Sequence, residues 1–365
     1  MDTSSLSRKV TLNDVACFHK TGLNRYAYRP NFIFGLFLIA TLMLGIGIAS
    51  GFAALWVPGM GILAAGIFAL INALADKEKV RFNYFAQDNN LTFSALRASD
   101  SHYDHNPRTD PTSLIATKSI EKSIIGQTGR SKQQLNIICG DSIASYTYQY
   151  TTGSGKNRRT HNWKVCMAKL SRELPHILLD SKANNFTVPG TRLGISNIAG
   201  GVRGSQKIDA GILSEHYDVY VPDSYDVDVL SVIGPDIVEK LLQFAKDYDI
   251  EIIDGYVYAY RSGQLKLKDT PTMFELAEML QDEFNDNLRN YRDQRVTTIS
   301  QREGISEKGL RLKKSRLPLI FGIWVFAIYM IVRLFAAQPS RLVLYAVTSV
   351  ICAVLVALYV RYRER

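Results

Sequence analysis

The stretch Asn31–Ala75 reads NFIFGLFLIATLMLGIGIASGFAALWVPGMGILAAGIFALINALA and contains no Asp, Glu, Lys, Arg or His. A hydrocarbon core about 30 Å thick is crossed by roughly 20 helical residues. This run of 45 residues is therefore long enough for two spans, and Val57-Pro58-Gly59 supplies residues suited to a turn between them. A secretory signal peptide is excluded because the run is about twice too long. We predict a transmembrane helical hairpin over residues 31–75.

The C-terminal part of the chain repeats this arrangement. The apolar stretches Leu317–Phe335 and Leu342–Val360 flank a polar connection, and Arg333 lies near enough to the end of its stretch to extend toward the headgroups. We therefore expect two hairpins, four membrane helices in all, around a central domain. The expected divisions are a basic N-terminal segment (1–30), the first hairpin (31–75), the central domain (76–307), a polybasic segment (308–316) and the second hairpin with a basic tail (317–365).

Basic residues indicate how these helices are oriented. Residues 1–30 contain five Lys or Arg, the turn near Pro58 contains none, and residues 308–316 contain five more. Loops rich in Lys and Arg stay on the cytoplasmic side of a membrane. We predict a multi-pass protein of the plasma (inner) membrane, with both termini and the central domain in the cytoplasm.

The formal net charge of +9 is concentrated beside the apolar segments. The central domain, residues 76–307, has 28 Lys and Arg against 31 Asp and Glu, a net charge of −3. This balance argues against a nucleic-acid-binding domain. The expected partner of the excess positive charge is the bilayer with its anionic headgroups. The residues expected to contact anionic lipid are Lys308, Arg311, Lys313, Lys314 and Arg316.

Small residues recur at four-residue spacing within the first apolar run. Gly47 and Gly51 form one pair, and Ala65, Ala69 and Ala73 form a series. Such faces let helices approach closely, so the hairpin is expected to pack on itself or on another copy of the chain. No acidic residue or His lies within a predicted span, which disfavours a proton or ion pathway.

Motifs for metals, cofactors and catalysis are weak. The four cysteines are scattered without a Cys-x-x-Cys pair, as is typical of a reducing cytosol. Gly153-Ser-Gly-Lys156 lacks the first Gly and the Ser or Thr of a P-loop. Asp100-Ser-His-Tyr-Asp-His105 contains metal-ligand residue types, but neighbouring ligands on one loop rarely converge on one ion. We expect no cofactor, no metal and no catalytic residue.

The central domain is predicted to be α+β, because strand and helix patterns follow one another in irregular order. Asp76 to about Asn89 is expected to continue the second span as a helix, and another helix begins near Pro235. In the helix expected over 271–295, an apolar stripe favours packing within the domain, with a dimer seam as the alternative. Strands are expected at Leu135–Cys139, Ile143–Tyr150, Trp163–Leu170, Tyr217–Val221, Asp249–Ile253 and Tyr256–Tyr260.

Acidic residues cluster at Asp247, Asp249, Glu251 and Asp254. On a strand, Asp249 and Glu251 share one face, and the intervening isoleucines share the other. Paired carboxylates perform acid–base chemistry only when burial or close approach shifts the pKa of one of them. The alternation instead predicts a solvent-exposed acidic face.

Two tyrosine stripes are the least ordinary feature of the domain. Tyrosines alternate along two predicted strands, so each trio projects from a single face. One interpretation is packing across strands or beneath a helix. The other is a partner-binding surface, because exposed Tyr supplies contact area at low entropic cost. The candidate surface residues are Tyr146, Tyr148, Tyr150, Tyr256, Tyr258 and Tyr260.

Part of the domain resembles a known group of sequences. The block LSEHYDVYVPDSYDVDVLSVIGPDIVEKLLQFAKDYDIEIIDGYVYAY, which ends at Tyr260, is similar to uncharacterised bacterial multi-pass membrane proteins carrying a domain of unknown function. The segments YTTGSGKNRRTHNWKV and LPHILL resemble them as well. Gly234 stands where Thr is expected before Pro-Asp, so the side-chain cap of that helix is in doubt. The resemblance implies a membrane location and a cytosolic α+β domain, and it implies no activity.

Two hypotheses follow. The first is a non-enzymatic membrane protein that presents a cytosolic protein-interaction or scaffold domain, with membrane or cytosolic proteins, or a second copy of the chain, as partners. The second is a membrane-anchored enzyme or small-ligand sensor. A pocket with converging polar groups would favour the second hypothesis, and a flat aromatic patch would favour the first.

Overall fold

A computed structural model describes residues 1–19, 26–98, 120–187, 194–198, 202–289, 291–296 and 304–313. The chain divides into two compact units, and each unit is built from three separate segments of the sequence. The first unit contains Met1–Leu114, Gly129–Cys166 and Ser262–Glu275. The second unit contains Ile115–Thr128, Met167–Arg261 and Leu276–Arg365.

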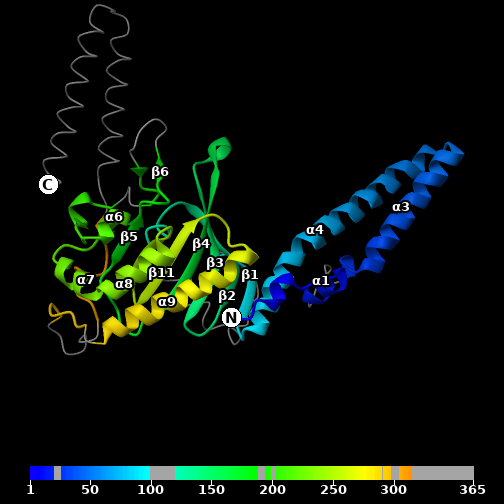
Figure 1. Ribbon diagram of the computed structural model, residues 1–365. Coiled ribbons are helices and arrows are strands. Elements are labelled where there is room, and N and C mark those ends of the chain that lie inside the picture. Colours follow the sequence, from blue (N-terminus) through cyan, green and yellow to red (C-terminus); the bar gives the residue numbers. More distant parts are fainter. Residues whose placement is uncertain are drawn as a thin grey trace, which may run out of the picture. The chain divides into compact units, whose positions relative to one another are not determined.

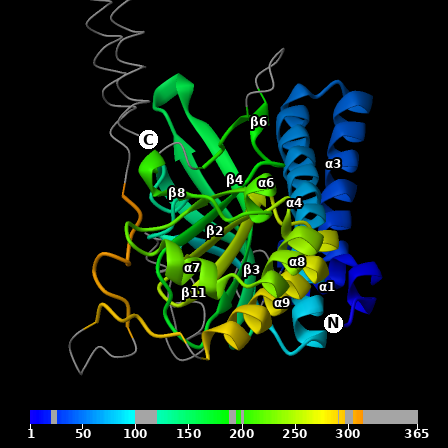
Figure 2. The same cartoon turned by 60° about the vertical axis from the view of Figure 1, so that its left-hand side comes forward.

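In the first unit, α3 (Pro30–Ser50) and α4 (Trp56–Asp88) form a hairpin through the short helix η2 (Ala53–Leu55). Figures 1 and 2 both show the two helices side by side along their length. Both are long and apolar enough to cross a membrane. α3 ends at Gly51, whose φ of 67° is a left-handed conformation that glycine adopts without strain.

The two helices meet along small residues at seven-residue spacing. Ala40 and Gly47 are buried on α3, and Gly59, Gly66 and Ala73 are buried on α4. A seven-residue repeat keeps one face of a helix turned toward its partner, whereas a strict four-residue repeat rotates around the helix axis. The hairpin therefore packs on itself through a heptad seam.

The four-residue pattern predicted this seam only in part. Gly47 and Ala73 are buried, but Gly51 and Ala65 are exposed and Ala69 is half-buried. The small residues correctly indicated that the two helices pack closely, but they did not give the period at which the helices touch, because that period is set by how the helices cross.

The prediction of an α+β domain flanked by four membrane helices is corrected. Among the described residues, only α3 and α4 are long and apolar enough to cross a membrane. The second predicted hairpin, residues 317–365, lies outside the described residues. The strands are antiparallel, four in the first unit and five in the main sheet of the second. An apolar run in a sequence gives only length and hydropathy, so it does not by itself place a helix.

α4 continues beyond its apolar half, which confirms the prediction of a helix from Asp76 onward. A helix of 33 residues is about 50 Å long, compared with about 30 Å for a hydrocarbon core. Near its end, Phe82 stacks on Phe93 of β1 (Thr92–Ala98) with ring centroids 5.9 Å apart. Phe85 packs on Phe274 at 6.2 Å. α4 thus passes from an apolar segment into the core of the first unit without a break.

The N-terminal residues pack on the polar half of α4. The short helix η1 (Ser4–Ser7) precedes α1 (Leu12–Phe18), which begins at a capping box formed by Thr11 and Asp14. Residues of α1 join a small apolar cluster with Ala73 and Val80 of α4. Burial of this face fixes the first residues of the chain to the helix.

The strands of the first unit follow the order β1-β2-β3-β4. Their bounds are Arg130–Cys139 for β2, Ile143–Thr152 for β3 and Arg159–Lys169 for β4. The predicted hairpin turn between residues 152 and 159 is confirmed, and it contains the helical turn η3 (Gly155–Asn157). Gly153 has a φ of 75°, and a Cβ there would collide with the Asn157 carbonyl oxygen, so the turn requires glycine.

The strands of the second unit follow the order β11-β10-β5-β9-β8. β6 (Phe186–Thr187) and β7 (Gly194–Ile195) form a separate two-stranded antiparallel sheet. β10 and β11 form a hairpin through Asp254-Gly255, both at positive φ, as expected for a tight Asp-Gly turn. The bounds are β5 (Ile177–Ser181), β8 (Lys207–Ile208), β9 (Tyr217–Tyr220), β10 (Asp249–Ile253) and β11 (Tyr256–Ser262).

Short helices accompany these strands. α8 (Pro235–Lys240) begins at Pro235, as predicted, and continues as a π-helical turn over Leu241–Ala245. Gly234 provides no side-chain cap, which agrees with the doubt raised by the sequence. The other helices are η5 (Gly204–Gln206), α6 (Leu213–His216), α7 (Asp226–Val232) and η7 (Leu267–Asp269).

α9 (Thr270–Leu288) corresponds to the helix predicted over 271–295, and it ends seven residues earlier. Its apolar stripe, from Met273 to Leu288, is buried. The stripe is thus part of the chain's own core rather than an exposed dimer seam. Tyr291, predicted as its last member, lies in the irregular segment that follows.

Candidate functional site

The acidic strand β10 lies within a hydrogen-bonded polar region of the second unit. All five of its residues are buried, including Asp249 and Glu251. The predicted solvent-exposed acidic face is therefore wrong. β10 lies between β5 and β11 and both of its faces are covered, so alternation of residue type does not separate an exposed face from a buried one.

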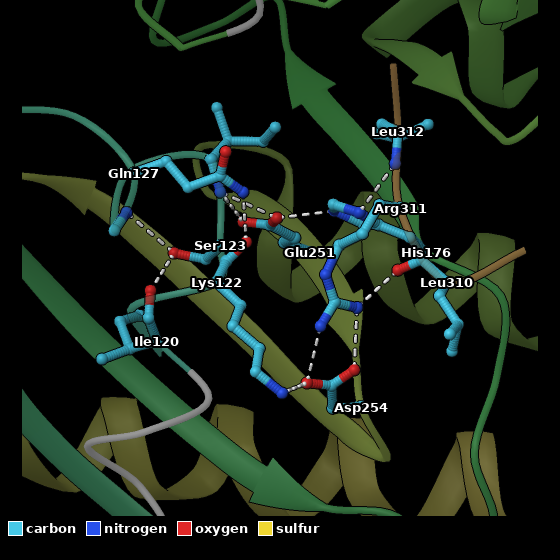
Figure 3. A network of polar contacts seen from close by, with 12 residues as sticks. Ile120, Lys122, Ser123, Gln127, His176, Glu251, Asp254, Leu310, Arg311 and Leu312 are labelled. Atoms are coloured by element: carbon cyan, nitrogen blue, oxygen red, sulfur yellow. Dashed lines mark hydrogen bonds and ion pairs between the residues drawn. The ribbon is translucent and has the colours of Figure 1, made fainter. Parts of the chain in front are cut away.

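Glu251 and His176 form a buried pair. Their exposed fractions are 0% and 1%, and His176 Nε2 lies 2.7 Å from Glu251 Oε1. The Ile124 N–H donates to both carboxylate oxygens, at 2.9 and 3.1 Å. The Tyr260 hydroxyl donates to Oε2 at 2.9 Å. Figure 3 shows the carboxylate of Glu251 pointing toward the imidazole of His176.

The hydrogen bonds define the state of the imidazole. The Leu312 N–H donates to His176 Nδ1 at 3.1 Å, so Nδ1 is an acceptor and carries no proton. Nε2 then carries the proton and donates a hydrogen bond to Glu251 Oε1. The structure thus contains a neutral imidazole oriented by a carboxylate, the arrangement that many catalytic dyads use.

This dyad is closed to substrate. Both oxygens of Glu251 accept hydrogen bonds, and both nitrogens of His176 are occupied by protein groups. A general base needs a free lone pair within hydrogen-bonding reach of a substrate proton. In this conformation the pair therefore stabilises the fold and holds residue 312 in place.

Residues 304–313, termed here the strap, are attached to the second unit along their length. The His176 N–H donates to the Gly309 carbonyl oxygen at 2.9 Å. The Lys313 N–H donates to Gln206 Oε1 at 2.8 Å, and its carbonyl accepts from the Arg203 N–H at 3.0 Å. On the side of the strap these bonds use backbone groups, so they add to the contacts that its side chains make.

An ion-pair cluster adds to this attachment. The Arg311 guanidinium donates to both oxygens of Asp254, at 2.8 and 3.0 Å, and Lys122 donates to the same carboxylate at 2.7 Å (Figure 3). Partial burial opposes ionisation of Asp254, but these cationic donors hold its pKa below the usual value. The bidentate geometry gives the contact orientation as well as charge.

Tyr225 anchors the beginning of the strap. Its hydroxyl donates to Asp293 Oδ2 at 2.6 Å and lies 2.6 Å from the Ser306 hydroxyl. The Ser306 N–H also donates to Asp293, at 3.0 Å. Burial, together with the bond to Asp293, raises the pKa of Tyr225 to about 12, so its hydroxyl stays a donor at neutral pH.

A second buried cluster places carboxyl groups on neighbouring strands. Asp180 of β5 lies opposite Asp218 of β9, and the Ser181 N–H donates to Asp249 of β10 at 2.9 Å. Burial raises the pKa of Asp249 to about 7, with the bond from Ser181 opposing it and the charge of Asp180 adding to it. Burial raises the pKa of Asp180 to about 6. Burial therefore moves the pKa of both Asp180 and Asp249 toward neutral pH.

A groove of about 710 Å³ lies beside α7. One wall contains Val227 and Val232 of α7, and the other is the segment 291–295. Arg295 donates to both oxygens of Asp228, at 3.1 and 2.8 Å, and stacks over the Tyr225 ring at 4.2 Å. The remaining lining residues are Ser231, Asn287, Tyr291, Arg292 and Gln294.

The tyrosine stripes do not form an exposed partner surface. Tyr146, Tyr148 and Tyr150 in the first unit are at most 6% exposed, and Tyr258 and Tyr260 in the second unit are fully buried. Tyr256 is half-buried. The packing interpretation is correct because both faces of these strands are covered, so projection from one face does not mean exposure.

Three of the five predicted lipid-contacting residues lie in the described part of the strap. Arg311 pairs with Asp254, and Lys313 pairs with Asp223. Lys308 is exposed. Two of these three cations are thus engaged by the protein in this conformation. Lys314 and Arg316, like the segment Asp100–His105, lie outside the described residues.

The sequence contained faint signals for the residues that were missed. His176 lies within Leu174-Pro-His-Ile-Leu-Leu179, directly before the apolar strand β5, and a single polar residue in such surroundings is typical of a buried, hydrogen-bonded group. Glu251 lies between isoleucines that are also buried. Its partners Ile124 and Tyr260 have no pattern in common with it, so the pairing was not predictable.

Comparisons with known proteins add little. No protein-family model matches the chain, and no curated protein matches it. Among solved structures, it is similar to the crystal structure of the mycobacterial trehalose monomycolate transport factor A, TtfA, at 9% sequence identity and a TM-score of 0.33, covering 57% of this chain and 92% of that chain. A likeness at this TM-score carries no argument about fold or function.

Proposed function

We propose that the chain is a membrane-anchored protein that acts by binding a partner protein through its cytosolic domain. The hairpin of α3 and α4 is the membrane anchor. Large apolar side chains on its outer faces, such as Phe34, Val57 and Phe68, are 69%, 79% and 70% exposed. Soluble proteins rarely expose such contiguous apolar surface, whereas lipid would cover it.

The observation that supports this proposal most directly is the unbroken path of α4. Its apolar half enters the packed aromatic residues around Phe82 and Phe85 without a flexible connection. An anchor of this kind holds the first unit at a fixed distance from the membrane surface. The basic residues of segment 1–30 support a cytosolic domain.

Binding is favoured over catalysis by the state of the buried dyad. His176 and Glu251 have no free hydrogen-bonding position for a substrate. The groove beside α7 offers a surface instead. Val227 and Leu230 of α7 are 80% and 44% exposed, which is unusual for apolar side chains next to a concave surface.

A small-ligand sensor is the second candidate. The groove volume of about 710 Å³ lies within the usual range of about 300–1,000 Å³ for ligand pockets. Its polar groups converge, and hydrogen bonds with Asp228 raise the pKa of Arg295 further. The permanently charged Arg295 beside the apolar wall of α7 suits a small amphiphilic ligand.

Site-specific crosslinking tests the two candidates. A photoreactive residue at Val227 is expected to capture a protein in native membranes, and Leu230→Asp should abolish that capture while leaving membrane insertion unchanged. A photoreactive residue at the exposed Lys246 is the matched control. Capture of only a small molecule favours the sensor. Equal capture from Val227 and Lys246 refutes a role for the groove.

The orientation has its own test. A reporter that is active only in the periplasm, inserted at residue 200, is expected to remain silent. Activity of this reporter contradicts the cytosolic placement of the domain.

A further inference from the structure

Two cations of the strap, Arg311 and Lys313, form ion pairs that can separate without leaving a buried charge unpaired. Asp254 binds both Arg311 and Lys122, so departure of Arg311 leaves the carboxylate paired. Asp223 and Lys313 are 48% and 56% exposed, so water can solvate both after they separate. Neither separation strands a buried charge, which is the usual reason why an ion pair resists opening.

The end of the strap and the three residues that follow it in the sequence are unusually basic. Residues 308–316 contain five Lys or Arg and no Asp or Glu. Lys308 is exposed, and it has no carboxylate partner in the part of the chain that the structure describes. The five positive charges of residues 308–316 exceed the two negative charges that Asp254 and Asp223 supply.

We propose that residues 308–313 bind anionic lipid headgroups in competition with Asp254 and Asp223. This inference rests on the proposed membrane anchoring. A phosphodiester accepts a bidentate bond from a guanidinium as a carboxylate does, so Arg311 exchanges one oxyanion for another. Each basic residue near an anionic leaflet increases binding about fivefold.

Two backbone amides report on this exchange. The Leu312 N–H is bonded to His176 Nδ1 and the Lys313 N–H to Gln206 Oε1, so both are protected while the strap is docked. In the full chain reconstituted in nanodiscs, both amides are expected to exchange about fivefold faster with phosphatidylglycerol present than in phosphatidylcholine alone, since Lys308 gains an ionic contact there and the other two cations exchange one for another. The Ile250 amide in the buried strand β10 is the internal control.

Variants separate the two partners of the strap. Lys308→Gln removes a cation that has no carboxylate partner among the described residues, so it should reduce the acceleration about fivefold. Asp254→Asn weakens the domain's hold on Arg311, so it should increase exchange even in neutral nanodiscs. Lys246→Gln, an exposed lysine elsewhere in the second unit, should change neither.

The outcomes are distinct. Equal exchange of Leu312 in both lipids, with the chain inserted, overturns this inference and leaves the anchoring intact. Acceleration by inorganic phosphate in neutral nanodiscs, beyond that of chloride at the same ionic strength, overturns the assignment to lipid. A chain that alkaline carbonate extracts from membranes refutes the anchoring and this inference together.

Discussion

Replacing Asp249 by Asn is expected to remove much of the pH dependence of folding between about pH 5 and pH 8. Burial raises the pKa of Asp249 to about 7 in the folded chain, against 3.8 ordinarily. Because this pKa is raised, the folded state binds the proton more tightly than the unfolded state does. Stability is therefore greatest below the ordinary value and declines as the pH rises through about 7.

The size of the effect follows from the two pKa values. A difference of about three pH units corresponds to about 4 kcal/mol, of which about 2.5 kcal/mol is lost between pH 5 and pH 8. For a chain of 365 residues, whose unfolding entropy is about 2.1 cal/mol/K per residue, that loss lowers the melting temperature by about 3 °C. Asp180, with a pKa raised to about 6, reinforces the decline at the lower end of this range.

The assay is thermal unfolding of the full chain in nanodiscs at the two pH values. Asp249→Asn should lose most of the decline seen in the natural chain. Asp247→Asn is the matched control, because Asp247 is 44% exposed and pairs with Arg261 at the surface. A natural chain whose melting temperature is unchanged or rises from pH 5 to pH 8 would refute the burial argument.

Three further predictions concern packing and hydrogen bonding. Glu251→Ala leaves three donors, two of them on fully buried side chains, without an acceptor, so it should destabilise the chain by about 3 kcal/mol or more, read as a lower melting temperature; an unchanged value contradicts the closed network. Gly47→Ala brings a Cβ within 2.6 Å of Trp56, whereas Gly66→Ala meets only ordinary contacts from 3.5 Å, so the first should weaken the hairpin and the second should not, as measured by disulfide crosslinking of engineered cysteine pairs. Gly309→Ala would place a Cβ 2.6 Å from an anchored tyrosine ring, so the strap should exchange faster with solvent, and unchanged exchange would argue against its tight seating.

The elements that local chemistry determines were predictable from the sequence. The absence of charge from Asn31 to Ala75 defined the hairpin, and the helix after Asp76 followed from continuity. The turn at Gly153 and the start of α8 at Pro235 were also predicted, since each depends on the backbone preference of one residue.

The burial of polar side chains was not predictable, because it depends on what covers a strand. Alternation predicted that Glu251 and the tyrosine stripes face one side of a sheet, which is correct geometry. Whether that side faces water depends on segments distant in the sequence, such as Ile124, which lies 127 positions from Glu251. The same reason explains why the pairing of Arg311 with Asp254 was not predicted.

The contacts of α4 with the first unit and those of the strap with the second unit depend on different forces. α4 enters the first unit through aromatic stacking, which is insensitive to ionic strength, whereas the strap joins the second unit through ion pairs such as Arg311–Asp254, which salt weakens. Raising the salt concentration in neutral nanodiscs should therefore accelerate amide exchange in residues 311–313 while leaving the residues around Phe85 protected. Equal acceleration at both places would mean that the contacts of the strap open no more readily with salt than the aromatic contacts of α4 do. The proposed competition with lipid would then lose its physical basis.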